Sequence, residues 1–126
     1  MKRIPVRRWR IWLGFSLLLV SVLASAAEVS VKALVTTPAH FDGQTVTIRG
    51  TAIAVKATVS KKGNPYTTFQ VQDANGAAVK VFAWEHPAVK DGGSVEVAGV
   101  FHQVKRVGRY TFYNEVEAQS VRPLTR

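Results

Sequence analysis

Seven side chains in the middle of the sequence have the types and the spacing of a binding face. They occupy alternate positions in two neighbouring segments: Tyr66, Thr68, Gln70, Gln72, Lys80, Phe82 and Trp84. The positions between them are apolar, as at Phe69, Val71 and Val81. Side chains alternate across a β-strand, so this pattern predicts two strands with one face in the core and one face open. Aromatic rings on an open face can stack on a flat ligand, and amides and a lysine can hydrogen-bond its edges.

Two predicted turns are rich in cations. Lys61 and Lys62 stand in the sequence KKGNP at 61–65, and Lys105, Arg106 and Arg109 stand in KRVGR at 105–109. Charged turns are common in proteins, so either turn alone is weak evidence for a site. Cations that border an aromatic face can contact the phosphates of a polyanion, with an affinity that falls as salt rises.

The residues that enzymes and metal sites use do not form a recognisable motif. The three histidines, His40, His86 and His102, lack metal-ligand spacing, and the chain has no cysteine. Nucleophile elbows, phosphate-binding glycine loops and zinc-protease motifs are also missing from the sequence. Glu115 and Glu117 share one face of the last predicted strand, about 7 Å apart, where a solvated outer surface is the favoured interpretation. We therefore expect a protein that is not an enzyme and has no metal or cofactor.

Five strands and a short preceding helix are predicted from the alternation and turn signals. Ser30 is a good N-cap for a helix with Val31 and Leu34 on one face. The first predicted strand begins at Thr45, and the other four cover 66–73, 78–84, 94–104 and 110–121. Glycines at apparent parity changes, Gly50 and Gly99, predict bulges or bends. The pattern indicates a mainly β fold, a five-stranded Greek-key barrel with a short N-terminal helix.

Three stretches carry a family resemblance: HFDGQTVTIRGTAIAV, YTTFQVQDANGAAVKVFAW and KDGGSVEVAGVF. Over residues 41–121 the chain resembles an OB-fold of the nucleic-acid-binding type, similar to the domain that holds anticodons in aminoacyl-tRNA synthetases. The resemblance implies a ligand lying across the second and third strands, flanked by the loops between strands one and two and between strands four and five. The chain departs from many members because it lacks a full helix between strands three and four. Exported bacterial OB-folds include stress-linked envelope proteins and a haem chaperone, whose attachment histidine and tyrosine have no counterpart after Val121.

The N-terminal segment predicts export. Residues 1–10 hold five cations and no acid, residues 11–23 are apolar, and the sequence ASAA follows at 24–27. This order is typical of a secretory signal peptide, and the apolar run is shorter than the roughly 20 residues of a membrane span. We expect a signal peptide at 1–27, although an uncleaved anchor is an alternative, and one OB-fold domain at 28–126. Removing the signal leaves a net charge of +4, and the product is expected in the periplasm or secreted.

Two hypotheses about function follow. In the first, an exported OB-fold module binds single-stranded nucleic acid or a related polyanion; Tyr66, Phe82 and Trp84 stack on bases, and Gln70 and Lys80 contact polar edges. In the second, an envelope or stress interaction protein uses the same face to bind a protein partner or a cell-wall glycan. Structural roles are alternatives for the rings: Trp84 plugging a barrel mouth, Phe82 packing under residues 39–41, and Tyr66 capping a sheet edge. The sequence sets no oligomeric state.

Overall fold

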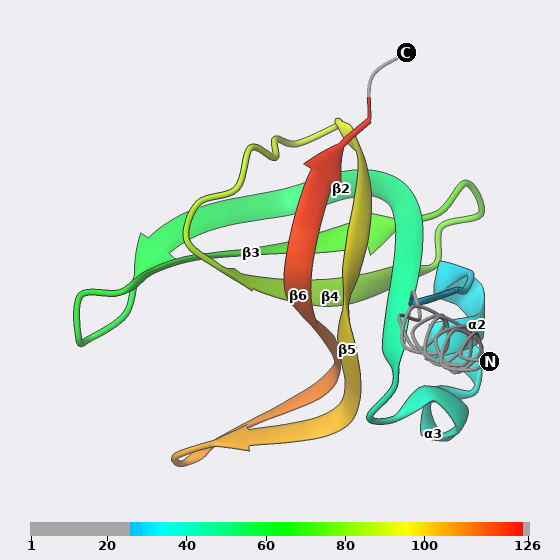
Figure 1. Cartoon of the computed structure of the whole chain (residues 1–126), viewed down its shortest axis with the longest axis horizontal. Coiled ribbons are helices and arrows are strands. Elements are labelled where there is room, and N and C mark those ends of the chain that lie inside the picture. Colours follow the sequence, from blue (N-terminus) through cyan, green and yellow to red (C-terminus); the bar gives the residue numbers. More distant parts are fainter. Residues whose placement is uncertain (1–25, 125–126) are drawn as a thin grey trace, which may run out of the picture.

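A computed structural model describes residues 26–124 as a single sheet with two short helices at one end (Figure 1). The elements in chain order are β1 (Ala27–Glu28), α2 (Val31–Thr36), α3 (Pro38–Phe41), β2 (Thr45–Val59), β3 (Pro65–Gln72), β4 (Ala78–Trp84), β5 (Ser94–Val107) and β6 (Tyr110–Pro123). Within this part of the chain, none of the helices combines the length and the apolar character that crossing a membrane requires. The predicted signal peptide lies almost wholly outside the described residues.

The five long strands connect in the manner of an OB-fold. The strand order is β1-β2-β3-β4-β6-β5, and β2 also pairs with β5, so each long strand has a neighbour on both sides. Antiparallel pairing dominates, and the β4–β6 pair is parallel because the chain crosses from β4 past β6 to enter β5 first. The prediction of five strands is wrong by one. The sixth, β1, is two residues long and pairs with β2 at Val46 and Thr47, too short to produce an alternating pattern.

The core lies inside this ring of strands and is covered at one end by α2. Its buried side chains come from every long strand: Val46, Ile48, Phe69, Val71, Val81, Val97, Phe101 and Val116. Helix α2 adds Val31 and Leu34, the face predicted from the sequence. The helix starts where expected, because the Ser30 hydroxyl accepts a hydrogen bond from the Ala33 amide at 3.0 Å.

The bend in β2 lies beyond the predicted position. Inward parity continues from Ile48 through Gly50 to Ala52, and the register with β3 shifts later, between Ile53 and Lys56. Ala54, with a φ of 55°, marks that bulge. Gly50 permits close packing against β3, because a Cβ there would lie 2.5 Å from the Gln72 carbonyl oxygen. Val59, at the end of β2, is exposed.

The irregularity at Gly99 is confirmed, with the extra residue on the partner strand. Ala98 pairs with Ser120 and Gly99 pairs with Ala118, which leaves Gln119 of β6 without an opposite residue. A Cβ at Gly99 would lie 2.2 Å from the Glu117 carbonyl oxygen, so only glycine permits this close approach.

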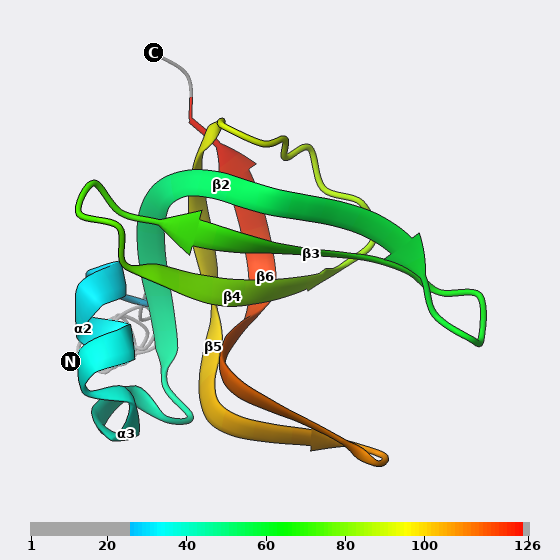
Figure 2. The same cartoon turned by 180° about the vertical axis from the view of Figure 1, so that it is seen from behind.

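Two hairpins extend from the sheet on the side away from the helices. Both views show the β2–β3 and β5–β6 hairpins projecting in the same direction, with β3 running away from the β2–β3 turn and β4 running back toward that side (Figures 1 and 2). The turn at 60–64 links β2 to β3, while residues 108–109 link β5 to β6. This arrangement places both cationic segments near the open face of β3 and β4.

Candidate functional site

The outward face predicted for β3 and β4 is present in the structure. Three cross-strand pairs form it: Tyr66 with Trp84, Thr68 with Phe82, and Gln70 with Lys80. Directly opposed residues of antiparallel strands point to the same side of the sheet. The intervening Phe69, Val71, Val79, Val81 and Ala83 are all buried. One face of this pair of strands is therefore core, and the other carries aromatic, amide and lysine side chains.

Tyr66, Phe82 and Trp84 form an aromatic cluster on this face. The Tyr66 and Phe82 rings stack with centroids 5.2 Å apart, and Trp84 meets Phe82 edge-on at 4.9 Å. Trp84 is 52% exposed, so the alternative in which it plugs one end of the core is wrong. Phe82 packs within this cluster and not beneath residues 39–41. All three rings belong to the open face, as the sequence predicts.

A groove of about 580 Å³ runs between this aromatic cluster and the β5–β6 hairpin. Its lining residues are Ser60, Tyr66, Thr68, Phe82, Trp84, His102, Lys105, Arg106, Val107, Tyr110, Phe112, Glu115 and Glu117. A hollow of about 260 Å³ continues from it and includes Gln70 and Lys80 along with Thr68, Phe112 and Glu115. From here on, the groove means these two neighbouring cavities taken together. Of the two segments predicted to border the aromatic face, 105–109 contributes Lys105, Arg106 and Val107 to the lining, whereas none of residues 61–65 lines it and only the preceding Ser60 does.

Lys105 occupies a different position from the one expected of a phosphate-binding rim residue. Strand β5 continues to Val107, so Lys105 lies on a strand and its side chain turns into the groove. Its ammonium nitrogen lies 2.7 Å from Glu115 Oε1 and 4.6 Å from the centroid of the Phe82 ring. The side chain is only 18% exposed. Lys105 is therefore part of the groove floor, and its charge is already matched by a carboxylate.

This position of Lys105 changes what Phe82 can do. Tyr66 reaches the Phe82 ring from β3, and Lys105 reaches it from the β5–β6 hairpin on the other flank of β4. With both flanks of the ring occupied, Phe82 supports the cluster and is not free to stack on a ligand. Trp84 is the ring most open for stacking, and Tyr66 is partly exposed.

The remaining predicted cations stay exposed around the groove. Lys61 and Lys62 stand on the β2–β3 turn next to Ser60, while Arg106 and Arg109 stand on the β5–β6 hairpin. Lys80 is exposed at the far end. Among residues 26–124, no carboxylate lies within ion-pair distance of these five side chains. Their charges are available to an anionic ligand.

Register adds one cation that sequence reasoning missed. Lys56 of β2 pairs with Thr68 of β3, so it shares the open face with Phe82 on the next strand. Its outward direction follows from the alternation of β2. Its position beside the aromatic cluster depends on the bulge at Ala54, which no local pattern reveals.

The surroundings of the two carboxylates in the groove also differ from the sequence prediction. Glu115, expected on a solvated surface, is buried, and its side chain is 7% exposed. Glu117 is 43% exposed, and its Oε1 lies 3.2 Å from His102 Nε2. In the described part of the chain these groups form no cluster of three or more metal-ligating side chains. Both carboxylates line the groove from β6.

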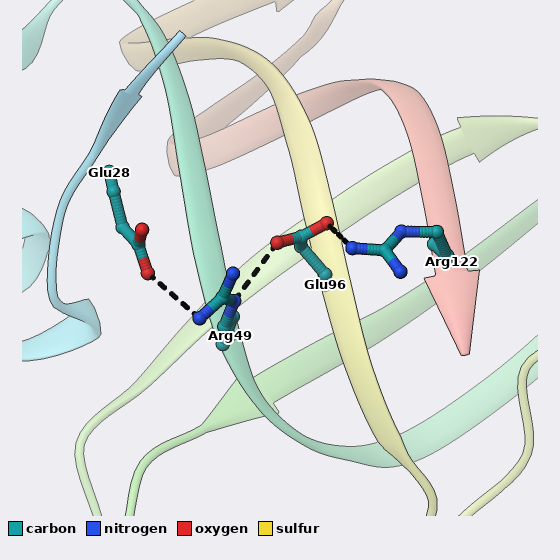
Figure 3. Close-up of polar contacts among 4 residues, drawn as sticks. All are labelled: Glu28, Arg49, Glu96 and Arg122. Carbon is teal, nitrogen blue, oxygen red and sulfur yellow. Dashed lines mark hydrogen bonds and ion pairs between the residues drawn. The ribbon is translucent and has the colours of Figure 1, made fainter. Parts of the chain in front are cut away.

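A second charged feature lies on the parts of β2, β5 and β6 that are remote from the groove. Glu28, Arg49, Glu96 and Arg122 alternate in sign and form what we call the ion-pair row (Figure 3). Arg49 Nε donates to Glu96 at 2.9 Å, its Nη1 lies 3.3 Å from Glu28, and Arg122 donates to the other oxygen of Glu96. Hydrogen bonds from Arg122 and then Arg49 hold the pKa of Glu96 below its ordinary value. Here every charge has a partner.

Comparison with known proteins identifies the fold. No family model and no curated protein sequence matches the chain. One chain of the crystal structure of yeast Stn1 and Ten1 is similar, with a TM-score of 0.62 and 10% identity, covering 82% of this chain and 65% of that chain. The second OB-fold domain of replication protein A from Methanococcus maripaludis matches with a TM-score of 0.46 and 20% identity, over 68% of this chain and 88% of that one. The likeness to the yeast chain agrees with the OB-fold strand order and concerns the fold alone.

Proposed function

We propose that this protein binds single-stranded nucleic acid, or a closely related polyanion, in the groove. Trp84 and Tyr66 would stack on bases, and the exposed cations Lys61, Lys62, Arg106 and Arg109 would contact phosphates. Gln70 and Lys80 would meet polar groups farther along the strand. In OB-folds, this face and these two loops are the places where oligonucleotides and oligosaccharides bind.

One observation carries this proposal: the exposed Trp84 lines a groove bordered by cations that have no carboxylate partner among residues 26–124. Stacking of a base on an aromatic side chain contributes about 1–3 kcal/mol and requires no particular sequence. Cations without carboxylate partners gain from phosphates because counterions are released. The two features together match a chain of alternating bases and phosphates better than they match a neutral ligand.

A second candidate is an envelope glycan or protein partner, and the carboxylates favour it. Glu115 and Glu117 line the groove beside aromatic rings, and sugar hydroxyls are good donors to carboxylates. A neutral glycan would leave the rim cations without a role, which is why we place this function second.

We propose further that the protein is exported and that it acts by binding. The basic, apolar and small-residue order of the N-terminus supports export to the periplasm or the cell exterior. A binding role without catalysis fits the lack of recognised catalytic motifs in the sequence.

Binding assays on the full chain distinguish the two candidates. Fluorescently labelled oligonucleotides of about 12 nucleotides, a length suited to one OB-fold, are titrated with protein at low and at moderate salt. We expect binding at low salt that weakens steeply as salt rises, and no competition from soluble cell-wall glycan fragments. If no oligonucleotide binds at low salt and glycan fragments bind without dependence on salt, the groove is a glycan site and the second candidate is favoured.

A further inference from the structure

The β6 wall of the groove carries two carboxylates for which stacking and phosphate contacts provide no use. Glu115 and Glu117 lie two residues apart on one strand, about 7 Å along its axis. Glu117 is the register partner of Phe82, so it stands directly beside the aromatic cluster. Any base stacked on Trp84 or Tyr66 therefore has carboxylate oxygens near its edge.

Glu117 retains hydrogen-bonding capacity toward the groove, whereas Glu115 is buried and paired. Glu115 Oε1 lies 2.7 Å from Lys105 Nζ, which balances its charge. Glu117 meets His102 through one oxygen. A carboxylate can only accept, so His102 Nε2 is the donor, and it fixes the orientation of Glu117. An ionised carboxylate has about four acceptor sites, which leaves Glu117 able to take further donors.

We infer that Glu117, oriented by His102, makes the groove prefer guanine among the bases; this inference rests on the proposed nucleic-acid function. Guanine presents two adjacent donors, N1–H and the N2 amino group, on the edge that is free in a single strand. A carboxylate can accept both. Thymine and uracil offer one N–H between two carbonyl oxygens, which the negative charge of Glu117 repels.

The same charges set the direction in which the ligand lies. Glu117 on the β6 wall repels phosphates, while Lys61, Lys62, Arg106 and Arg109 at the rim attract them. The backbone therefore follows the rim, and the base edges point inward toward Glu117. This orientation is what allows a groove with acidic side chains to accept an anionic polymer.

A change of one exocyclic group on the ligand tests the inference. The full chain is titrated with three labelled strands: thymine only, thymine with isolated guanines, and the same strand with hypoxanthine, which lacks the N2 amino group, in place of guanine. We expect the guanine strand to bind about tenfold more tightly than the thymine strand, and hypoxanthine to lose most of that gain. Glu117→Gln should remove the preference and keep the affinity for the thymine strand. Glu28→Gln, in the ion-pair row, is the matched control and should retain the preference.

Each contrary result has a distinct meaning. Equal affinity of the parent protein for all three strands would overturn the guanine preference and leave the proposed function intact. A preference that survives Glu117→Gln would overturn the role of Glu117. If no strand binds even at low salt, the proposed function fails, and the inference fails with it.

Discussion

The groove and the ion-pair row both place basic side chains on the outside of the same sheet, with different surroundings. In the ion-pair row, Arg49 and Arg122 share Glu96, and Arg49 also meets Glu28. At the groove, the cations on the rim have no carboxylate partner among the described residues, and the one lysine that has a partner, Lys105, lies beneath the rings. The comparison teaches that a basic residue marks a ligand site only when the protein leaves its charge unmatched.

Removal of the Lys105 ammonium group should give the largest effect, a loss of unfolding free energy. The loss should be much larger at the groove than in the ion-pair row. Lys105→Met leaves Glu115 buried without a counter-charge, which we expect to cost about 2–4 kcal/mol of unfolding free energy. Arg122→Met, in the exposed ion-pair row, should cost much less. Chemical denaturation followed by circular dichroism measures both.

A double variant sharpens that test. Adding Glu115→Gln to Lys105→Met removes the buried charge and should restore part of the lost stability. If Lys105→Met unfolds at the same denaturant concentration as the parent, the pair with Glu115 is not a buried structural element.

Trp84→Ala should weaken nucleic-acid binding without loss of stability. The expected loss is about 1–3 kcal/mol, or roughly 5- to 150-fold in Kd, because one base loses its stacking surface. The indole is half exposed, so the core is unaffected. Tyr113→Ala is the matched control, since Tyr113 is 61% exposed and lies outside the groove lining. Oligonucleotide titration at low salt compares them, and equal weakening by both variants would contradict a specific role for Trp84.

Neutralising the rim should change the salt dependence of binding. The double variant Lys61→Gln and Lys62→Gln removes up to two phosphate contacts, so the slope of log K against log salt should become shallower by up to about 1.4. Lys32→Gln, an exposed lysine on α2 that also lacks an ion-pair partner among the described residues, should leave the slope unchanged. An unchanged slope in the double variant would remove the β2–β3 turn from the interface.

The smallest effect concerns pH and the ion-pair row. The pKa of Glu96 lies below its ordinary 4.5 because Arg122 and Arg49 donate hydrogen bonds to it. Its stabilising contribution is therefore present above that ordinary pKa and is lost as pH falls through the folded-state value. Glu96→Gln should lower stability slightly at neutral pH, and the difference from the parent should shrink in acid. A difference that grows as pH falls would reverse this sign.

The sequence predicted those parts of the fold that depend on local alternation. The strand Ala78–Trp84 and the outward set from Tyr66 to Trp84 are confirmed because burial on one face enforces a period of two. The extension of β5 to Val107 was missed, because polar residues at a hairpin tip resemble a loop. The pairing of Lys105 with Glu115 and the position of Lys56 depend on the register between strands distant in sequence and on the bulge at Ala54. No local pattern carries that information.

The central claim, that the groove binds single-stranded nucleic acid, is tested most directly by nuclear magnetic resonance on the full chain. The Trp84 indole N–H is assigned by its disappearance in Trp84→Phe, and an oligonucleotide of about 12 nucleotides is added at low salt. The account predicts that this resonance and the amides around Lys61 and Arg106 shift, while the amides of Arg49, Glu96 and Arg122 stay in place. An unmoved Trp84 resonance, or shifts confined to the ion-pair row, would contradict the claim.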